Sequence, residues 1–369
     1  AKLGPRVDAL SLPWVHTGEH RSPAFARWGE RLWRRPHLYG AAATLVLVLL
    51  ALPALGLKTG MPSIKVVPRD DPSRVGYEQV QQAFGAGSPG ALQLVGPRAD
   101  VAAAAAVATR DAGIGRVLPP QPGSGGLALA QAIPTSDPSD PAVGETIERL
   151  RDTLPASVYV GGAVAENHDL EAALAAKTPL VIGVVLVLGF LLLLVALQAP
   201  LIAALGVATN LLATGAAFGV GRLIFQDGRW TGLLGYESQG FLDAWGPVFF
   251  FAMIFAISMD YTVFLLASAK EHYDRTGDPR EAAIGGLAHS GRVIFAAAAV
   301  MVAVFFTFAL SGPLPPKEMG VILGIAVLLD AMLIRLVLMP TLLRVFGHRA
   351  WALPRWLDRI LPDIRFGHA

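Results

Sequence analysis

The sequence predicts a membrane protein whose fold class is an α-helical membrane bundle of six helices, arranged 1 + 5, with an external α+β domain. Three observations lead to this prediction. Charged residues make up 16% of the 369-residue chain, against roughly 25% in ordinary soluble domains. Mean hydropathy is +0.51. Apolar residues gather in six runs, and the polar segment 58–178 separates the first run from the other five.

Each apolar run is long enough to cross a bilayer, whose hydrocarbon core of about 30 Å needs about 20 helical residues. The runs hold only three charged residues, Asp260, Asp330 and Arg335. This pattern excludes a soluble enzyme and a disordered chain. The runs are 38–57, 180–197, 199–221, 244–269, 293–311 and 319–343.

Basic residues in the short loops predict a multi-pass protein of the cell membrane with both termini in the cytoplasm, where such residues accumulate. Fourteen Lys and Arg lie within 18–37, 270–292 and the tail after 343, whereas 222–243 and 312–318 hold three. An even number of crossings agrees. The predicted segments are a cytoplasmic lead-in or linker, a first membrane helix, an extracytoplasmic domain, a five-helix bundle and a cytoplasmic tail, at 1–37, 38–57, 58–178, 179–345 and 346–369.

The net charge, the cysteine count and the absence of certain motifs exclude several classes of function. The net charge of +2 comes from basic residues beside the apolar runs, so no nucleic-acid partner is expected. The absence of cysteine excludes disulfides, thiol catalysis and Cys-based metal sites. The sequence has no Walker, HExxH or GxSxG motif, so we expect no enzyme, no metal and no cofactor.

The segment 58–178 alternates short helical and extended patterns. Its core order is βαββαβ, which is the split ferredoxin-like pattern. We expect the last helix of this segment to run into the second membrane helix, and 270–292 to form a surface helix begun by Asp278–Pro279. The predicted helices are 74–84, 100–110, 141–154 and 164–176, and the predicted strands are 91–95, 114–118, 126–133 and 157–160.

Asp260 is the strongest candidate for a functional residue. A charged side chain in mid-membrane is disfavoured by about 2.5–3.5 kcal/mol on insertion scales, and such residues usually face a bundle interior. Burial disfavours the ionised form of a carboxylate, so Asp260 can load and unload a proton. Tyr261 supplies a neighbouring hydroxyl that can pass or hold it, and Ser258 lies two residues before Asp260. The alternative is a structural, hydrogen-bonded Asp.

Asp330 and Arg335 are the second candidates. A spacing of five residues turns them about 140° apart on an α-helix, so we expect no pairing between them. Asp330 falls at a depth similar to that of Asp260, which predicts one polar layer, with Arg335 as its counter-charge. Alternatively, Arg335 extends towards the headgroups. Ser290 either donates to this layer or caps a helix start. The pairs Gly215–Gly219 and Gly320–Gly324 predict close helix packing.

A family resemblance rests on particular residues. Residues 249–266 read FFFAMIFAISMDYTVFLL, and the pattern continues with Gly277-Asp278-Pro279, Gly291-Arg292-Val293-Ile294, Leu329-Asp330-Ala331 and 335–340. These stretches resemble one repeat of the MMPL family, a branch of the RND superfamily of proton-driven exporters. The resemblance covers about 38–346. It implies that the external domain is of the porter type.

The resemblance also implies a function. It predicts export of lipids or other hydrophobic substrates across the cytoplasmic membrane, driven by the proton gradient, with Asp260, Tyr261, Asp330 and Arg335 as the proton relay. Such transporters have two repeats. The expected partner is therefore a missing N-terminal repeat or a second copy of this chain. The alternative is a non-transporting module of the same superfamily that senses lipids or serves assembly.

Overall fold

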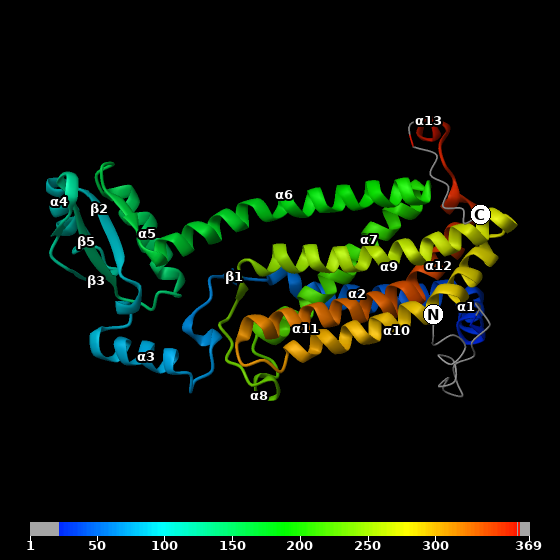
Figure 1. The fold of residues 1–369 in the computed structure, drawn as a ribbon, viewed down its shortest axis with the longest axis horizontal. Coiled ribbons are helices and arrows are strands. Elements are labelled where there is room, and N and C mark those ends of the chain that lie inside the picture. Colours follow the sequence, from blue (N-terminus) through cyan, green and yellow to red (C-terminus); the bar gives the residue numbers. More distant parts are fainter. Residues whose placement is uncertain (1–21, 360, 362–369) are drawn as a thin grey trace, which may run out of the picture.

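The computed structural model describes residues 22–359 and residue 361, which form an elongated molecule (Figure 1). A helical bundle forms one end, and a small α+β domain forms the other. The first 21 residues of the predicted lead-in, and most of the last ten residues of the predicted tail, lie outside the described residues.

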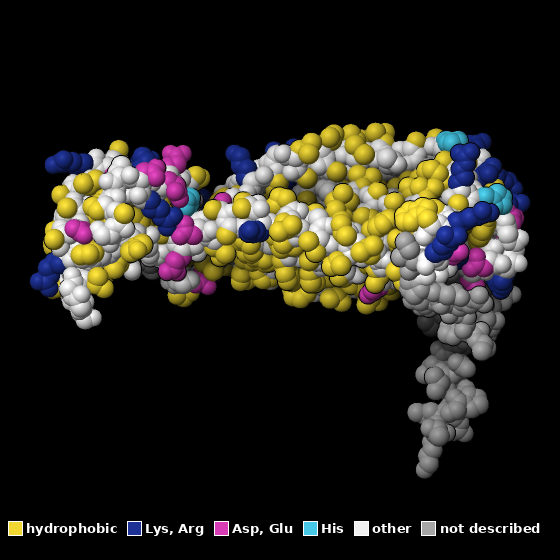
Figure 2. Space-filling view, turned by 90° about the horizontal axis from the view of Figure 1, so that it is seen from above, with side chains coloured by type: hydrophobic (Ala, Val, Ile, Leu, Met, Phe, Trp, Pro, Cys, Tyr) yellow, Lys and Arg dark blue, Asp and Glu magenta, His cyan; other side chains and the backbone are white. Residues whose placement is uncertain are grey.

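The described part of the chain holds six helices that are long and apolar enough to cross a membrane, which confirms the six predicted from the sequence. Figure 2 shows hydrophobic side chains along the length of the bundle, with Lys and Arg gathered at the end away from the sheet. The six spans are Pro36–Gly56, Ala163–Leu197, Pro200–Gln226, Gly246–Thr276, Pro279–Phe308 and Leu314–Trp351.

These spans are built mostly of α-helix with a few tighter or wider turns. Before the first span, α1 (Pro23–Arg34) packs against α10 (Pro279–Phe308) at the end of the bundle away from the sheet (Figure 1). The spans consist of α2 (Pro36–Ala51) with the 3-10 turn η2 (Leu52–Gly56), α6 (Ala163–Leu197), α7 (Pro200–Gly221) with the π turn η6 (Arg222–Gln226), α9 (Gly246–Thr276), α10 (Pro279–Phe308), and α11 (Leu314–Leu329) with the π-helix η7 (Asp330–Leu338), α12 (Met339–Phe346) and the 3-10 turn η8 (Gly347–Trp351).

The helices extend further than the apolar runs. The prediction that a helix continues from the external segment into the second span is confirmed, because α6 runs unbroken through Pro179. The predicted separate surface helix over 270–292 is wrong. Instead α9 continues to Thr276, and α10 begins at Pro279, with Asp278 accepting a cap hydrogen bond from the Arg280 N–H at 2.9 Å. Gly277 makes the turn with a φ of 65°.

The α+β domain follows the predicted βαββαβ order. Its antiparallel sheet runs β3–β5–β2–β6, with the short strand β4 added beside β5. Strand β2 buries alternate residues, Leu92 and Leu94 among them, and helices α4 and α5 contribute Val101 and Ile147 to the same core. The elements are α3 (Pro72–Phe84), β2 (Leu92–Pro97), α4 (Arg98–Ala108), β3 (Ile114–Val117), β4 (Gln121–Pro122), β5 (Leu127–Pro134), α5 (Pro141–Thr153) and β6 (Tyr159–Gly161).

A second, two-stranded sheet ties this domain to the bundle. Strand β1 (Thr59–Gly60), just after the first span, pairs in parallel with β7 (Leu242–Asp243), just before α9. The Leu242 N–H donates to Lys58 O at 3.0 Å, and the Ala244 N–H donates to Gly60 O at 2.9 Å. This pairing fixes the segment after the first span to the segment before α9, beside Asp243.

The Gly215–Gly219 pair lies where α7 crosses α2. A Cβ on Gly219 would sit 1.9 Å from Leu50 O, whereas a Cβ on Gly215 would meet only the Ala51 Cβ, at 3.5 Å. The two glycines therefore differ in role: only Gly219 needs the absence of a side chain for the backbones to approach.

We expect Gly219→Ala to lower the free energy of unfolding by about 1–3 kcal/mol, because the α2–α7 contact must open to admit the methyl group. Thermal unfolding of the purified protein measures this effect. Gly215→Ala is the matched control on the same helix and is expected to leave the unfolding temperature close to that of the wild type. Equal effects from both substitutions would contradict the assigned contact.

Candidate functional site

A buried ion pair lies in the middle of the bundle. Arg335 and Asp330 are 1% and 5% exposed. The Arg335 Nε donates to Asp330 Oδ2 at 2.8 Å, and its NH2 group donates to the same oxygen. The sequence-based expectation that these two residues do not pair is wrong.

The reason for this error is the backbone of η7. A π-helix forms its hydrogen bonds between residues five apart, and the Met339 N–H donates to Ile334 O in this way. Residues 330 and 335 therefore lie one turn apart, although an α-helix would have separated them. Because each charge neutralises the other, the bundle avoids an isolated charge in hydrocarbon.

Helix α9 supplies the remaining partners of the pair. The Arg335 NH2 group donates to Ser258 Oγ at 3.0 Å and also to Ser258 O. The Arg335 Cζ lies 5.2 Å from the centre of the Tyr261 ring, a cation–π distance. The Tyr261 hydroxyl donates to Met301 Sδ on α10 at 3.2 Å. Four of the six predicted site residues, Ser258, Tyr261, Asp330 and Arg335, thus form one cluster, which we call the central cluster.

Asp260 is not part of the central cluster. Its side chain is exposed, although it was expected to face the bundle interior. The buried face of α9 holds Phe255, Ser258 and Thr262, and the helical period turns residue 260 away from that face. Asp260 lies instead in an exposed apolar stripe with Phe249, Ala256 and Phe264.

Ser290 lies outside the central cluster as well. It is fully buried in α10, and its hydroxyl donates to Gly286 O of the same helix at 2.6 Å. It neither donates to the carboxylates nor caps a helix start, because α10 begins eleven residues earlier at Pro279. Ser290 therefore satisfies its hydroxyl within its own helix and packs in the bundle interior.

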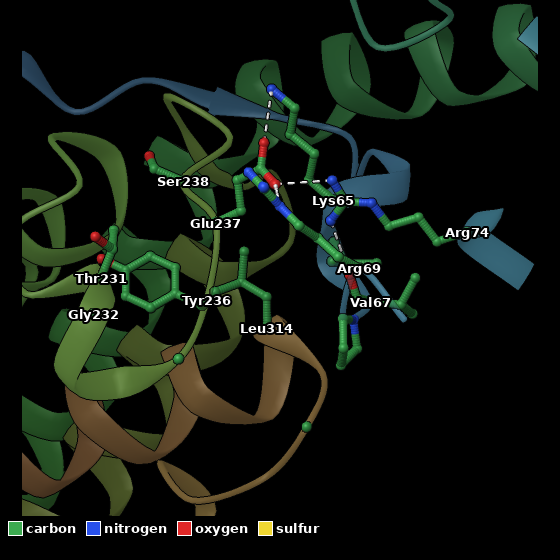
Figure 3. A pocket seen from close by; sticks show the side chains of 14 residues that line it. Lys65, Val67, Arg69, Arg74, Thr231, Gly232, Tyr236, Glu237, Ser238 and Leu314 are labelled. Carbon is green, nitrogen blue, oxygen red and sulfur yellow. Dashed lines mark hydrogen bonds and ion pairs between the residues drawn. The ribbon is translucent and has the colours of Figure 1, made fainter. Parts of the chain in front are cut away.

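A pocket of about 440 Å³ lies where the α+β domain joins the bundle (Figure 3). Glu237 contacts three cations there. The Arg74 NH2 group and the Arg69 Nε donate to Glu237 Oε2 at 2.8 and 3.1 Å, and the Lys65 Nζ lies 3.9 Å from Oε1. The hydrogen bond from Arg74 lowers the pKa of Glu237 from its ordinary value. The pocket is also lined by Tyr236 and by Leu314, at the start of α11.

Sequence reasoning missed a second set of buried polar residues at this end of the bundle. Asp243, Lys317 and Glu318 were assigned to the loops 222–243 and 312–318, yet all three are buried. The sequence did carry one signal that these residues could meet, because the two loops are predicted to lie on the same side of the membrane. Within residues 22–359, no group of three or more His, Asp or Glu is arranged to hold a metal ion.

Comparison with known proteins places these residues in a family context. The model of the MMPL family matches residues 127–362. The chain is 35% identical over 360 residues to the heme uptake protein MmpL11 of Mycobacterium tuberculosis (strain ATCC 25618 / H37Rv), over 93% of this chain and 37% of that protein.

Two further relatives are named as exporters. The chain is 33% identical to the mycolic acid-containing lipids exporter MmpL11 of Mycolicibacterium smegmatis, over 96% of this chain and 39% of that protein. It is 27% identical to the trehalose monomycolate exporter MmpL3 of Mycobacterium tuberculosis (strain CDC 1551 / Oshkosh), over 98% of this chain and 41% of that protein. The chain thus spans less than half the length of these relatives.

Proposed function

Because the chain belongs to the MMPL family of membrane transport proteins, we propose that it is one repeat of a proton-driven exporter of lipids or other hydrophobic molecules. The observation that carries this proposal is the position of Asp260. It is a carboxylate near the middle of a membrane span, on an apolar face, next to Tyr261 of the central cluster.

The central cluster divides the roles of the charged residues. Asp330 and Arg335 already neutralise each other, so neither needs a proton to be stable in the membrane. Asp260 lies outside the cluster, and ionising a carboxylate in hydrocarbon is costly. Asp260 is therefore the residue of α9 that we assign to proton uptake. The next residue, Tyr261, contacts Arg335 through its aromatic ring.

A partner surface accounts for the exposed stripe around Asp260. The chain spans 37–41% of the length of the three relatives described above, which supports a second repeat or a second copy facing α9. In that assembly Asp260 would lie between two bundles. A change of its charge would then alter how the bundles pack, and the membrane potential supplies about 2.3 kcal/mol per charge per 100 mV to drive such a change.

The junction described above supports transmission of this movement to the external domain. A shift of α9 reaches β7, which directly precedes it, and through β1 reaches the domain. The predicted orientation in the cell membrane, with both termini cytoplasmic, places this domain outside. The basic side chains at the opposite end of the bundle agree with that orientation (Figure 2). Lipid substrates are supported by the names of two of the relatives, which are described as exporters of mycolic acid-containing lipids and of trehalose monomycolate.

Reconstitution of the protein into liposomes tests the proposal. Liposomes with an imposed proton gradient would be loaded with a fluorescent lipid, and its movement to an acceptor outside would be followed. We expect movement only with protein and gradient together, and a return to the protein-free rate when a protonophore is added. Protein-dependent lipid binding without gradient-dependent movement would instead support the lipid-sensing alternative.

A further inference from the structure

Two carboxylates at the sheet end of the bundle lack the partners that buried carboxylates need. Asp243, in β7, and Glu318, in the first turns of α11, are both 0% exposed. Among the residues that the structure describes, neither oxygen of Glu318 has a hydrogen-bond partner, and neither does Asp243 Oδ2. Asp243 Oδ1 accepts one long hydrogen bond, from Gln239 Nε2 at 3.4 Å.

The two groups are close enough to influence each other. The charge and the backbone amide of Asp243 both act on the Glu318 carboxylate. Two ionised carboxylates that are near each other repel strongly when water is excluded, and each unsatisfied oxygen adds a desolvation cost.

The cation next to Glu318 in the sequence does not relieve this repulsion. Lys317 is adjacent to Glu318 in the sequence and is also buried. Its Nζ donates to the backbone carbonyls of Leu234 and Gly235, at 3.0 Å for the latter. The ammonium group therefore binds the end of α8 (Thr231–Leu234) and not a carboxylate.

We propose that Asp243 and Glu318 form a proton-binding site, in which one carboxyl O–H donates to the other carboxylate. A single proton supplies the donor that the orphan oxygens lack and removes one of the two negative charges. This site is separate from Asp260 and lies at the opposite end of α11 from the central cluster.

The site lies where it can act on the external domain. Asp243 belongs to β7, whose backbone is hydrogen-bonded to β1, and Glu318 belongs to a membrane helix. With the proton bound, the pair holds β7 against α11. Without it, charge repulsion separates the two elements and loosens the attachment of the domain.

The surroundings of Asp243 favour its protonated form. Burial raises the pKa of Asp243 from its ordinary value to about 6. Burial, with a smaller effect of the Glu318 charge, raises the pKa of Tyr236 to about 12, so this hydroxyl stays protonated. The other charged groups on the packed elements are Lys317 on α11, Lys65 on η3 (Ile64–Val66), which faces Glu237, and Arg222 on η6, which faces Asp227.

Infrared difference spectroscopy of the full chain tests the site. Below about pH 6 the wild type is expected to show the C=O stretch of a protonated carboxyl. Glu318→Gln is expected to lose it, because the amide supplies the missing donor and leaves Asp243 ionised. Glu237→Gln changes a nearby carboxylate that is already paired, and it should keep the band. A spectrum of Glu318→Gln identical to that of the wild type would overturn the proposal.

The pH dependence of stability gives a second, independent readout. The folded protein holds the proton up to about pH 6, whereas the unfolded chain releases it near the ordinary pKa of 3.8. The proton's contribution is therefore complete below the lower value and is lost as the pH rises through the upper one. The unfolding temperature of the wild type should fall over this range, and that of Asp243→Asn should fall less. Parallel curves would overturn the proposal, whatever the transport assay shows.

Discussion

Replacing Asp330 by asparagine is expected to lower the free energy of unfolding by about 3–5 kcal/mol, the range measured when a buried ion pair loses one partner. The substitution keeps the shape of the side chain, but it leaves the Arg335 guanidinium uncompensated at 1% exposure. Arginine cannot lose its proton in a protein, so the guanidinium stays charged and buried without a partner. Thermal or chaotrope unfolding of the purified protein in detergent measures the loss.

Two further variants serve as controls: one replaces the other partner of the ion pair, and one replaces both partners. Arg335→Gln leaves Asp330, which can neutralise itself by taking up a proton, so its cost should be smaller. The double variant Asp330→Asn with Arg335→Gln carries no charge, and it should be more stable than Asp330→Asn alone. Additive losses in the double variant would mean that the two residues do not act as a pair.

Replacing Asp260 by asparagine is expected to abolish proton-gradient-dependent transport, with a fall to the protein-free rate, while the protein still inserts and folds. The amide has nearly the same shape as the carboxyl, but it cannot bind or release a proton. Because the side chain is exposed in this chain and lies outside the central cluster, the substitution removes no buried partner. Lipid movement in liposomes and the unfolding temperature are measured on the same preparation.

Asp274 offers a matched control on the same helix. It lies near the end of α9, 58% exposed, and pairs with Lys270 at 3.2 Å, a surface ion pair of little energetic weight. Asp274→Asn should therefore transport at the wild-type rate. Transport by Asp260→Asn at that same rate would refute the relay, whereas loss of transport in both variants would indicate a general effect of charge on α9.

The sequence determined the elements with high fidelity where a local signal existed. The six apolar runs became six spans because the length of an apolar helix alone decides whether it can cross a bilayer. The order of strands and helices in the α+β domain followed from alternating and helical periods. The cap at Asp278 was visible because Asp followed by Pro is itself a local signal.

The sequence was misleading where the backbone departed from the regular helix. The spacing between Asp330 and Arg335 excludes pairing only if the segment is α-helical, and the π-helix over Asp330–Leu338 reversed that conclusion. The sequence also could not predict which way the Asp260 side chain points. A single charged residue in an apolar run carries no information about which face the neighbouring helices cover.

By itself, then, the sequence determined which segments enter the membrane, which segment folds outside the bundle, and which residue types carry chemistry. Only the tertiary structure decided which of these residues are neighbours. It joined Ser258 to Arg335, and it brought Asp243 and Glu318 together from segments 75 residues apart. The physical reason is that hydropathy and capping act over a few residues, whereas the partner of a buried charge depends on backbone hydrogen bonding and on the packing of distant helices.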